Sequence, residues 1–325
     1  MTLLAVEGLH VRLPTPGGLV TVVDGVDYEI APAQVFGIAG ESGSGKTVSM
    51  LALLGLLPER SKVEGSASFD GRELLGMPRK QLREVSGREL SMVFQDPFTS
   101  LHPMLSVGKQ LTEHIRLHLG LDRRSAERRA VELLADVRIP APEAALRAFP
   151  HQFSGGMRQR IAIAIALACR PKLLIADEPT TALDVTVQAG ILRLLDRLRQ
   201  EHELAVVLIT HDVGVLSSIA DTVSIFYAGR VVESGTRDEV LQSPRHPYTR
   251  ALLDALPHPE AEKEKPLVAI GGAPPTPGRF PPGCAFNPRC RFAIDSCRTE
   301  VPPLVAVGSR RLACPVDPLV GEAYA

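Results

Sequence analysis

The chain has no tryptophan, few aromatic residues and no long apolar run. Its longest apolar run, Ile161 to Cys169, is nine residues between two arginines, whereas spanning a bilayer takes about 20. We therefore expect no membrane-crossing segment. The N-terminus reaches Glu7 without the positive stretch and apolar region of a secretory signal, so we expect the chain to stay in the cytosol.

The chain also lacks an excess of positive or of negative charge. Basic residues number 36 and acidic residues 37, which gives a formal net charge of −1. Without a basic excess to attract the phosphate backbone, a nucleic-acid partner is not expected. A length of 325 residues with ordinary globular composition predicts two structural units, or one large domain with an appendage.

Cysteine and proline are scarce until the last third of the chain. Only 12 of the 27 prolines lie in residues 1–243, and 15 fall in residues 244–318. One cysteine, Cys169, precedes residue 284, and the other four are Cys284, Cys290, Cys297 and Cys314. In a reducing cytosol such a cluster indicates metal ligands before disulfides. A proline-rich connector from Pro259 to Pro282 is expected to hold no long helix or central strand.

Before residue 244, short apolar runs alternate with helical patterns. The runs Val35 to Ala39, Leu173 to Ala176 and Val206 to Ile209 predict buried strands of an α/β fold with a largely parallel sheet. A helical pattern rich in Arg and Glu, between Leu111 and Val137, predicts a helical insertion with a solvated face.

A glycine-rich motif follows the first of these strands. It reads Gly40-Glu41-Ser42-Gly43-Ser44-Gly45-Lys46-Thr47 and precedes an apolar helix, which is the context of a phosphate-binding loop. Its amides and the helix N-terminus would cradle a phosphate chain. Lys46 would neutralise the β- and γ-phosphates, and the Thr47 hydroxyl would bind Mg²⁺.

Two carboxylates follow the second strand. Asp177 and Glu178 come directly after Leu173 to Ala176, at the strand end where parallel sheets bind ligands. Asp177 is predicted to hold Mg²⁺ and Glu178 to polarise the attacking water.

Further segments indicate which class of nucleotide-binding protein this is. They are Gln95 in Met92-Val93-Phe94-Gln95-Asp96, the run Phe153-Ser154-Gly155-Gly156-Met157 before a helix, Thr181-Ala182-Leu183-Asp184, and His211 after a strand. In this order the motifs resemble the ATP-binding cassette (ABC) family over about residues 3–243. The resemblance implies a P-loop NTPase of the ABC ATPase type, with a RecA-like core, an antiparallel β edge and a helical subdomain at about 97–165. The ABC ATPase domain is then 1–243, and 244–325 is a Pro/Cys-rich C-terminal extension.

The resemblance also assigns roles to individual residues. Family members work as head-to-tail dimers, so Ser154, Gly155 and Gly156 would contact the γ-phosphate of ATP on the partner, and Asp184 would contact the opposing subunit. Gln95 would contact Mg²⁺ and the water and couple them to the membrane partner, and His211 would bind the γ-phosphate and fix Glu178. Met157 departs from the family's commoner Gln.

A second departure concerns the nucleotide base. The loop Pro14-Thr15-Pro16-Gly17-Gly18-Leu19-Val20 has no aromatic ring, although most cassettes stack one against adenine. Apolar contact from Leu19 or Val20 would have to replace it. We therefore expect weak discrimination between ATP and GTP.

The segment Ser243-Pro244-Arg245-His246-Pro247-Tyr248-Thr249-Arg250 resembles the one that follows the cassette in oligopeptide and dipeptide importers. This resemblance implies an ATPase subunit at the cytoplasmic face of the membrane. Its partners would be two permease subunits, a second ATPase subunit in a heterodimer, and an extracytoplasmic solute-binding protein. Nickel, oligosaccharides or opine-like solutes remain alternatives to peptides.

The cysteine spacing C-x5-C-x6-C-x16-C matches no short zinc-ribbon or ferredoxin pair. Four thiolates suit zinc or iron–sulfur, and free thiols are a third alternative. Resemblance to the peptide importers implies a [4Fe-4S] cluster on Cys284, Cys290, Cys297 and Cys314. Two other functions are weaker alternatives: a cassette ATPase acting on DNA or ribosomes, and a regulatory module that binds ATP without useful hydrolysis.

Overall fold

The computed structural model describes residues 2–96, 100–181, 183–255 and 269–318, and the chain groups into two compact units. The first comprises Met1–Thr2, Ile30–Val35 and Gly76–Ile209, and the second Leu3–Glu29, Phe36–Leu75 and Thr210–Ala325. The predicted domains 1–243 and 244–325 divide the sequence differently and stay predictions. Residues 97–99, 182 and 256–268 lie outside the described ranges. They include the start of the predicted helical subdomain, one residue of the Thr181–Asp184 motif and part of the proline-rich connector.

In the first unit, three parallel strands run in the order β8-β7-β6. They are β6 (Leu90–Val93), β7 (Leu173–Asp177) and β8 (Ala205–Ile209). Every residue of β7 and β8 is buried, as expected for strands rich in Val, Ile and Leu with both faces covered. Asp177 therefore sits at the carboxyl end of a strand that is fixed on both sides.

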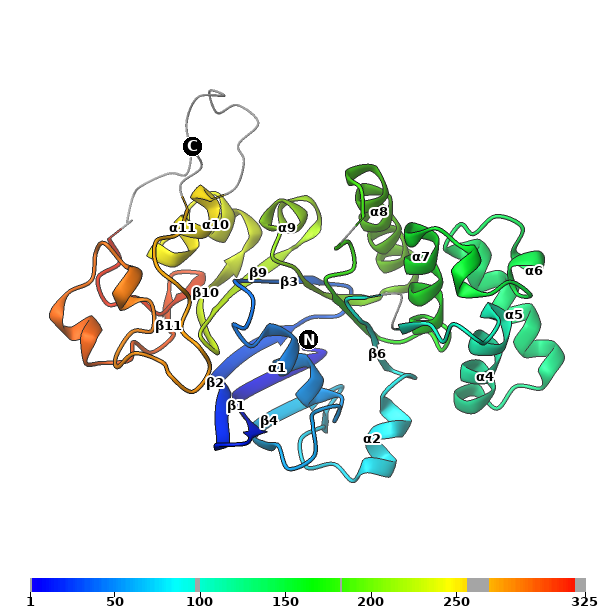
Figure 1. Ribbon diagram of the computed structural model, residues 1–325, viewed down its shortest axis with the longest axis horizontal. Coiled ribbons are helices and arrows are strands. Elements are labelled where there is room, and N and C mark those ends of the chain that lie inside the picture. The colour runs from blue at the N-terminus through cyan, green and yellow to red at the C-terminus, as the bar shows by residue number, and fades with distance from the viewer. Residues whose placement is uncertain (1, 97–99, 182, 256–268, 319–325) are drawn as a thin grey trace. The chain divides into compact units, whose positions relative to one another are not determined.

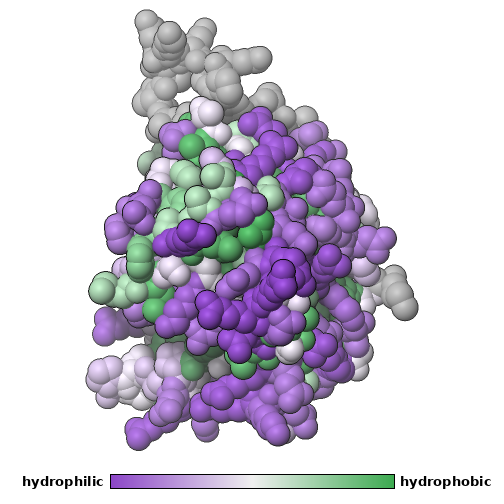
Figure 2. All heavy atoms as spheres, turned by 90° about the vertical axis from the view of Figure 1, so that its right-hand side faces the viewer, coloured by the Kyte–Doolittle hydropathy of each residue, from purple (hydrophilic) through white to green (hydrophobic). Residues whose placement is uncertain are grey.

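Helices form the rest of this unit, and the helical insertion expected between Leu111 and Val137 is present. Gly120 ends the first of its helices in a left-handed conformation, and the Asp122 carboxylate caps the next by accepting the Ser125 N–H at 2.9 Å. The helices are α2 (Arg79–Val85), α4 (Val107–Leu119), α5 (Arg123–Asp136), α6 (Pro142–Ala145), α7 (Gly155–Ala166) and α8 (Val185–His202), with a 3₁₀ turn η1 (Pro150–Gln152). The side of Figure 1 where α4 to α6 lie faces the viewer in Figure 2, and it is mostly hydrophilic with hydrophobic residues gathered in its upper part.

The second unit contains two groups of strands (Figure 1). One is a four-stranded sheet in the order β2-β1-β4-β5, in which Leu4 of β1 pairs with Phe69 of β4. In the other, the order is β11-β12-β10-β9-β3, with β3 parallel to β9 and the remaining pairs antiparallel. The strands are β1 (Leu4–Thr15), β2 (Gly18–Ile30), β3 (Val35–Ala39), β4 (Lys62–Phe69), β5 (Arg72–Glu73), β9 (Thr222–Tyr227), β10 (Arg230–Thr236), β11 (Val305–Val307) and β12 (Arg310–Leu312).

Its helices are α1 (Lys46–Leu53), α9 (Val213–Ile219), α10 (Arg237–Leu241) and α11 (Pro247–Asp254), with 3₁₀ turns η2 (Asn287–Arg289) and η3 (Asp295–Arg298). No helix in the described ranges is both long and apolar enough to span a bilayer.

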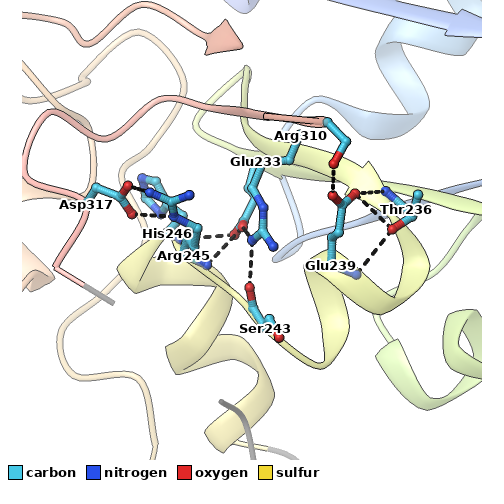
Figure 3. Close-up of polar contacts among 9 residues, drawn as sticks. Glu233, Thr236, Glu239, Ser243, Arg245, His246, Arg310 and Asp317 are labelled. Carbon is cyan, nitrogen blue, oxygen red and sulfur yellow. Dashed lines mark hydrogen bonds and ion pairs between the residues drawn. The ribbon is translucent and has the colours of Figure 1, made fainter. Parts of the chain in front are cut away.

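Strands β11 and β12 of the C-terminal region join the sheet of this unit. Strand β12 pairs with β10, with Glu233 opposite Leu312 and Ser234 opposite Arg311. Figure 3 shows the side chains that support the pairing: Arg310 reaches Glu233, and Arg245 bonds Asp317 at 2.8 Å between Nε and Oδ1. Residues 310–317 are therefore attached by main-chain and side-chain bonds.

Glu233 is the buried centre of this attachment. Its side chain is fully buried and accepts from Arg310 at 3.1 Å and from the N–H groups of Arg245 and His246 at 2.9 and 3.0 Å. Burial raises the pKa of Glu233 despite these donors, and burial lowers the pKa of His246 to about 3. His246 is thus neutral, and its Nδ1 accepts the Tyr248 N–H at the start of α11.

Arg310→Ala should destabilise the protein by about 3 kcal/mol, because it leaves a buried carboxylate without its cation. The loss should be larger at pH 8 than at pH 5. The pKa of Glu233 is already raised in the folded wild type, and removal of the Arg310 charge raises it further. The variant therefore loses more stability than the wild type as pH rises through the folded-state pKa. Urea unfolding at both pH values measures this. The exposed Arg298→Ala is the matched control, and equal losses at the two pH values would contradict the account.

Candidate nucleotide site

The phosphate loop connects β3 to α1, as the sequence predicts. Gly40, Gly43 and Gly45 have φ values of 146°, 78° and 98°, which L side chains rarely adopt. A Cβ on Gly40 would lie 2.1 Å from the Phe226 carbonyl oxygen, and one on Gly45 would lie 2.8 Å from the Val22 carbonyl oxygen. At Gly43 a Cβ would meet nothing within 4 Å, so one side of the loop is open.

Lys46 is the first residue of α1 and is 6% exposed. Its ammonium group donates to the carbonyl oxygens of Gly40 and Glu41 at 2.8 and 2.9 Å, so it lies folded over the loop. Ser44 and Gly45 are buried, Thr47 is half-buried, and Ser42 is exposed. An open glycine turn, a buried lysine and a helix N-terminus together fit a phosphate chain.

The carboxylate residues gather in the first unit. Asp177 ends β7 and is 4% exposed. Glu178 follows with φ 46°, a strained value for a residue with a side chain. Its carboxylate accepts from Gln95 Nε2 and from Thr181 Oγ1, both at 2.9 Å. The structure therefore brings together Gln95 and Glu178, and it adds Thr181, for which the motifs predicted no role of its own.

The N-termini of helices α7 and α8 lie close together in this unit. Ser154 caps α7 by accepting the Met157 N–H at 3.4 Å, and Asp184 caps α8 by accepting the Val187 N–H at 2.9 Å. A Cβ on Gly156 would lie 2.5 Å from Val187 Cγ1. Glycine is therefore required for the close approach of the two helix starts, and both caps are exposed.

His211 belongs to the second unit, as the phosphate loop does, whereas Glu178 belongs to the first. The His211 side chain is exposed, and the residue before it, Thr210, is buried. The next residue, Asp212, caps α9 by accepting the Gly214 N–H at 2.9 Å. His211 thus sits at the start of a short helix, and its catalytic role stays a prediction.

The loop expected to face the base is flanked by the C-terminal segment. A Cβ on Gly278 would lie 2.8 Å from Val20 Cγ1. Leu19 is 41% exposed, so it is available for an apolar contact. The structure thus places an extension residue next to the loop that lacks an aromatic ring.

The predicted iron–sulfur cluster, and its zinc alternative, are wrong. Cys284, Cys290, Cys297 and Cys314 are all described and line one apolar cavity with a volume of about 20 Å³, room for a single water. No group of three or more His, Cys, Asp or Glu side chains in the described ranges is placed to hold a metal ion. Burial raises the pKa of Cys284 to about 11 and also raises the pKa values of Cys290 and Cys314, so these thiols pack as neutral groups. The extension is attached by strand pairing and not by a metal.

Sequence reasoning missed a set of contacts to Glu41, the second residue of the loop. Its carboxylate pairs with Arg289 and its N–H donates to Tyr248 Oη at 2.9 Å. Tyr248 lies in the segment that indicated the importer family, and the sequence suggested no contact for its side chain. Arg289 is one arginine among several in the tail, and no pattern distinguished it.

Comparison with known proteins agrees with these features. The ABC transporter family matches residues 23–181, and the family "Oligopeptide/dipeptide transporter, C-terminal region" matches residues 232–297. The oligopeptide transport ATP-binding protein OppD of Haemophilus influenzae is 48% identical, covering 91% of each chain. The dipeptide transport ATP-binding protein DppD of Escherichia coli is 47% identical, covering 94% of this chain and 93% of its own.

Among solved structures, the dimeric ATP-binding cassette MJ0796 bound to ADP and Pi has a TM-score of 0.65 and 25% identity, covering 72% of this chain and 98% of its own. The fold and the site thus define an ABC ATPase cassette, and the predicted family and enzyme class are confirmed. The chain belongs to the oligopeptide/dipeptide transport ATP-binding proteins of the ABC transporter family.

Two of the glycines of the loop, Gly40 and Gly43, offer a direct test of its packing. Gly43→Ala should cost about 1 to 2 kcal/mol of stability from the left-handed backbone alone. Gly40→Ala should cost clearly more, because its Cβ would also overlap the Phe226 carbonyl oxygen. Thermal melts of the two variants measure the difference, and equal losses would show that the close approach is not a constraint.

Proposed function

We propose that this chain hydrolyses ATP to energise a transporter, and that the phosphate loop carries the binding. The observation behind the proposal is the buried Lys46 beside an open Gly43, at the N-terminus of α1. The loop amides and the helix end would hold the phosphate oxygens, and Lys46 would exchange its carbonyl partners for them. Ser42, Gly43, Ser44 and Gly45 supply the turn.

The carboxylate residues would carry the hydrolysis. Glu178 is held by Gln95 and Thr181, so its carboxylate is oriented to accept a proton from the attacking water. Asp177 and Thr47 would hold Mg²⁺, and Gln95 would contact it; the ion supplies neutralisation of charge on the phosphates. We further propose that His211 bonds the γ-phosphate.

A dimer would complete the reaction. We propose that Ser154, Gly155 and Gly156 contact ATP on a second ATPase subunit, and that Asp184 contacts that subunit across the interface. The exposure of Ser154 and Asp184 supports this, because both helix starts are accessible to a partner. The names of the relatives and the match to the C-terminal region support peptides as the solute. Nickel or oligosaccharide import is the alternative.

The partners are proposed to be two membrane permease subunits and an extracytoplasmic solute-binding protein, with this chain at the cytoplasmic face of the membrane. Support comes from exposed hydrophobic side chains of the first unit. Met104 and Leu117 are each 77% exposed, Phe94 is 42% exposed and Phe149 is 38% exposed. Apolar side chains that reach the surface are available for contact with a partner protein. The domain boundaries 1–243 and 244–325 belong to the same proposal.

Glu178→Gln should retain ATP affinity and lower kcat by at least about a hundredfold, because the amide cannot accept the proton of the water. Calorimetric ATP binding and phosphate release measure the two quantities. Glu201→Gln, an exposed change on α8, is the control. Undiminished turnover in the Glu178 variant would remove that residue from its role.

GTP should bind within about tenfold of ATP, since the missing ring would have contributed stacking of about 1 to 3 kcal/mol. Leu19→Ala should weaken both nucleotides alike. Competition titrations give both affinities, and strong exclusion of GTP by the wild-type chain would contradict this account of the base.

A further inference from the structure

Glu41 is held at three points, although it is one of the variable positions of the phosphate-loop motif. Its carbonyl oxygen accepts from Lys46 at 2.9 Å, its N–H donates to Tyr248 Oη at 2.9 Å, and its carboxylate pairs with Arg289. The Arg289 pair is bidentate, with Nη1 to Oε2 at 2.7 Å and Nη2 to Oε1 at 3.0 Å. Two of these three contacts therefore come from residues after 243, namely Tyr248 and Arg289.

Arg289 is itself fully engaged. A guanidinium has five N–H donors, and here Nε donates to the Gly271 carbonyl oxygen at 2.8 Å, while the other four reach Glu41, Tyr227 and Ile270. The side chain is 4% exposed. A lysine has three donors and no fork, so it cannot reproduce this set.

The surroundings make the arginine rigid. Its guanidinium carbon lies 5.8 Å from the ring centroids of both Tyr227 and Phe286. The rings of Tyr227, Tyr248 and Phe286 pack with centroids 4.4 to 5.4 Å apart, and all three are buried. This aromatic cluster joins β9, α11 and the turn η2.

The extension is also anchored by contacts that do not involve this cluster. Strand β12 pairs with β10, and Arg310 bonds Glu233 and the Ser243 carbonyl oxygen (Figure 3). Arg289 is thus carried by a segment that strand pairing fixes at residues 310–312. An ion pair supported in this way can impose a position on its partner, unlike a mobile surface pair.

We propose that Arg289 is a positioning residue for the phosphate loop: through its bidentate pair with Glu41, the C-terminal extension holds the loop in the shape that receives ATP. The proposal rests on the proposed ATPase function. The extension then has a part in nucleotide binding that needs no contact with the nucleotide. Loss of the pair lowers affinity, because the loop must be ordered again at each binding event.

Steady-state hydrolysis and calorimetric Mg-ATP binding with the full chain test this. Arg289→Gln raises KM and Kd for ATP about tenfold and leaves kcat within about twofold, since saturating ATP restores the loop. Arg289→Lys recovers only part of the loss. Glu41→Gln gives the same increase as Arg289→Gln, and the double variant is no weaker than either single variant.

Tyr248→Phe covers the case in which the arginine variants do not fold. It removes one hydroxyl and keeps the buried ring, and it raises KM about threefold through the Glu41 N–H alone. Arg298→Gln, an exposed arginine of the same extension, stays within about twofold of wild type and is the control.

The outcomes separate the two proposals. If Lys46→Ala abolishes ATP binding while the Glu41, Arg289 and Tyr248 variants bind like wild type, the positioning role is wrong and the ATPase function stands. The same holds if the double variant shows the product of two independent losses. If the wild-type chain binds no ATP, the proposed function itself is overturned.

Discussion

The close packing of the phosphate loop against neighbouring main chain is the constraint on which the nucleotide site depends. The position of a Cβ at residue 40 is 2.1 Å from the Phe226 carbonyl oxygen, and the Gly229 N–H donates to the Ser44 carbonyl oxygen at 3.0 Å. These main-chain contacts restrict the shape of the turn before a ligand binds, and the Arg289–Glu41 pair adds a further restraint. Because that shape turns Lys46 inward, a buried cation is available at the helix N-terminus before any nucleotide arrives.

The positions of the two carboxylates, Asp177 and Glu178, depend on a different constraint. Strand β7 is buried along its whole length, so its carboxyl end is fixed, and Glu178 follows in a left-handed conformation. Strain of this kind persists where surrounding structure determines it. Here the Glu178 N–H donates to the Ile209 carbonyl oxygen at 2.8 Å, and Gln95 and Thr181 bond the side chain. The result is a carboxylate with a defined orientation.

Local patterns in the sequence predicted most of these parts. The strands Val35–Ala39 and Leu173–Asp177 lie where the apolar runs predicted them, directly before or at their motifs. Apolar runs and motif spacing are both local signals, so they can be recognised in the sequence. The contacts of Arg289 and Tyr248 with Glu41 join residues more than 200 positions apart, and no local pattern encodes such a pair. The cysteines show the opposite case: residue type and family resemblance predict a metal site, whereas the structure packs the four thiols around a cavity of about 20 Å³.

Hydrogen exchange at the loop amides tests the central claim most directly. The full chain would be labelled with and without Mg-ATP, and exchange would be followed in peptides covering residues 40–49. The account predicts that Mg-ATP slows exchange in these peptides, since phosphate oxygens accept from the loop N–H groups. Exchange that is unchanged at saturating Mg-ATP would contradict the assignment of this turn as the nucleotide site.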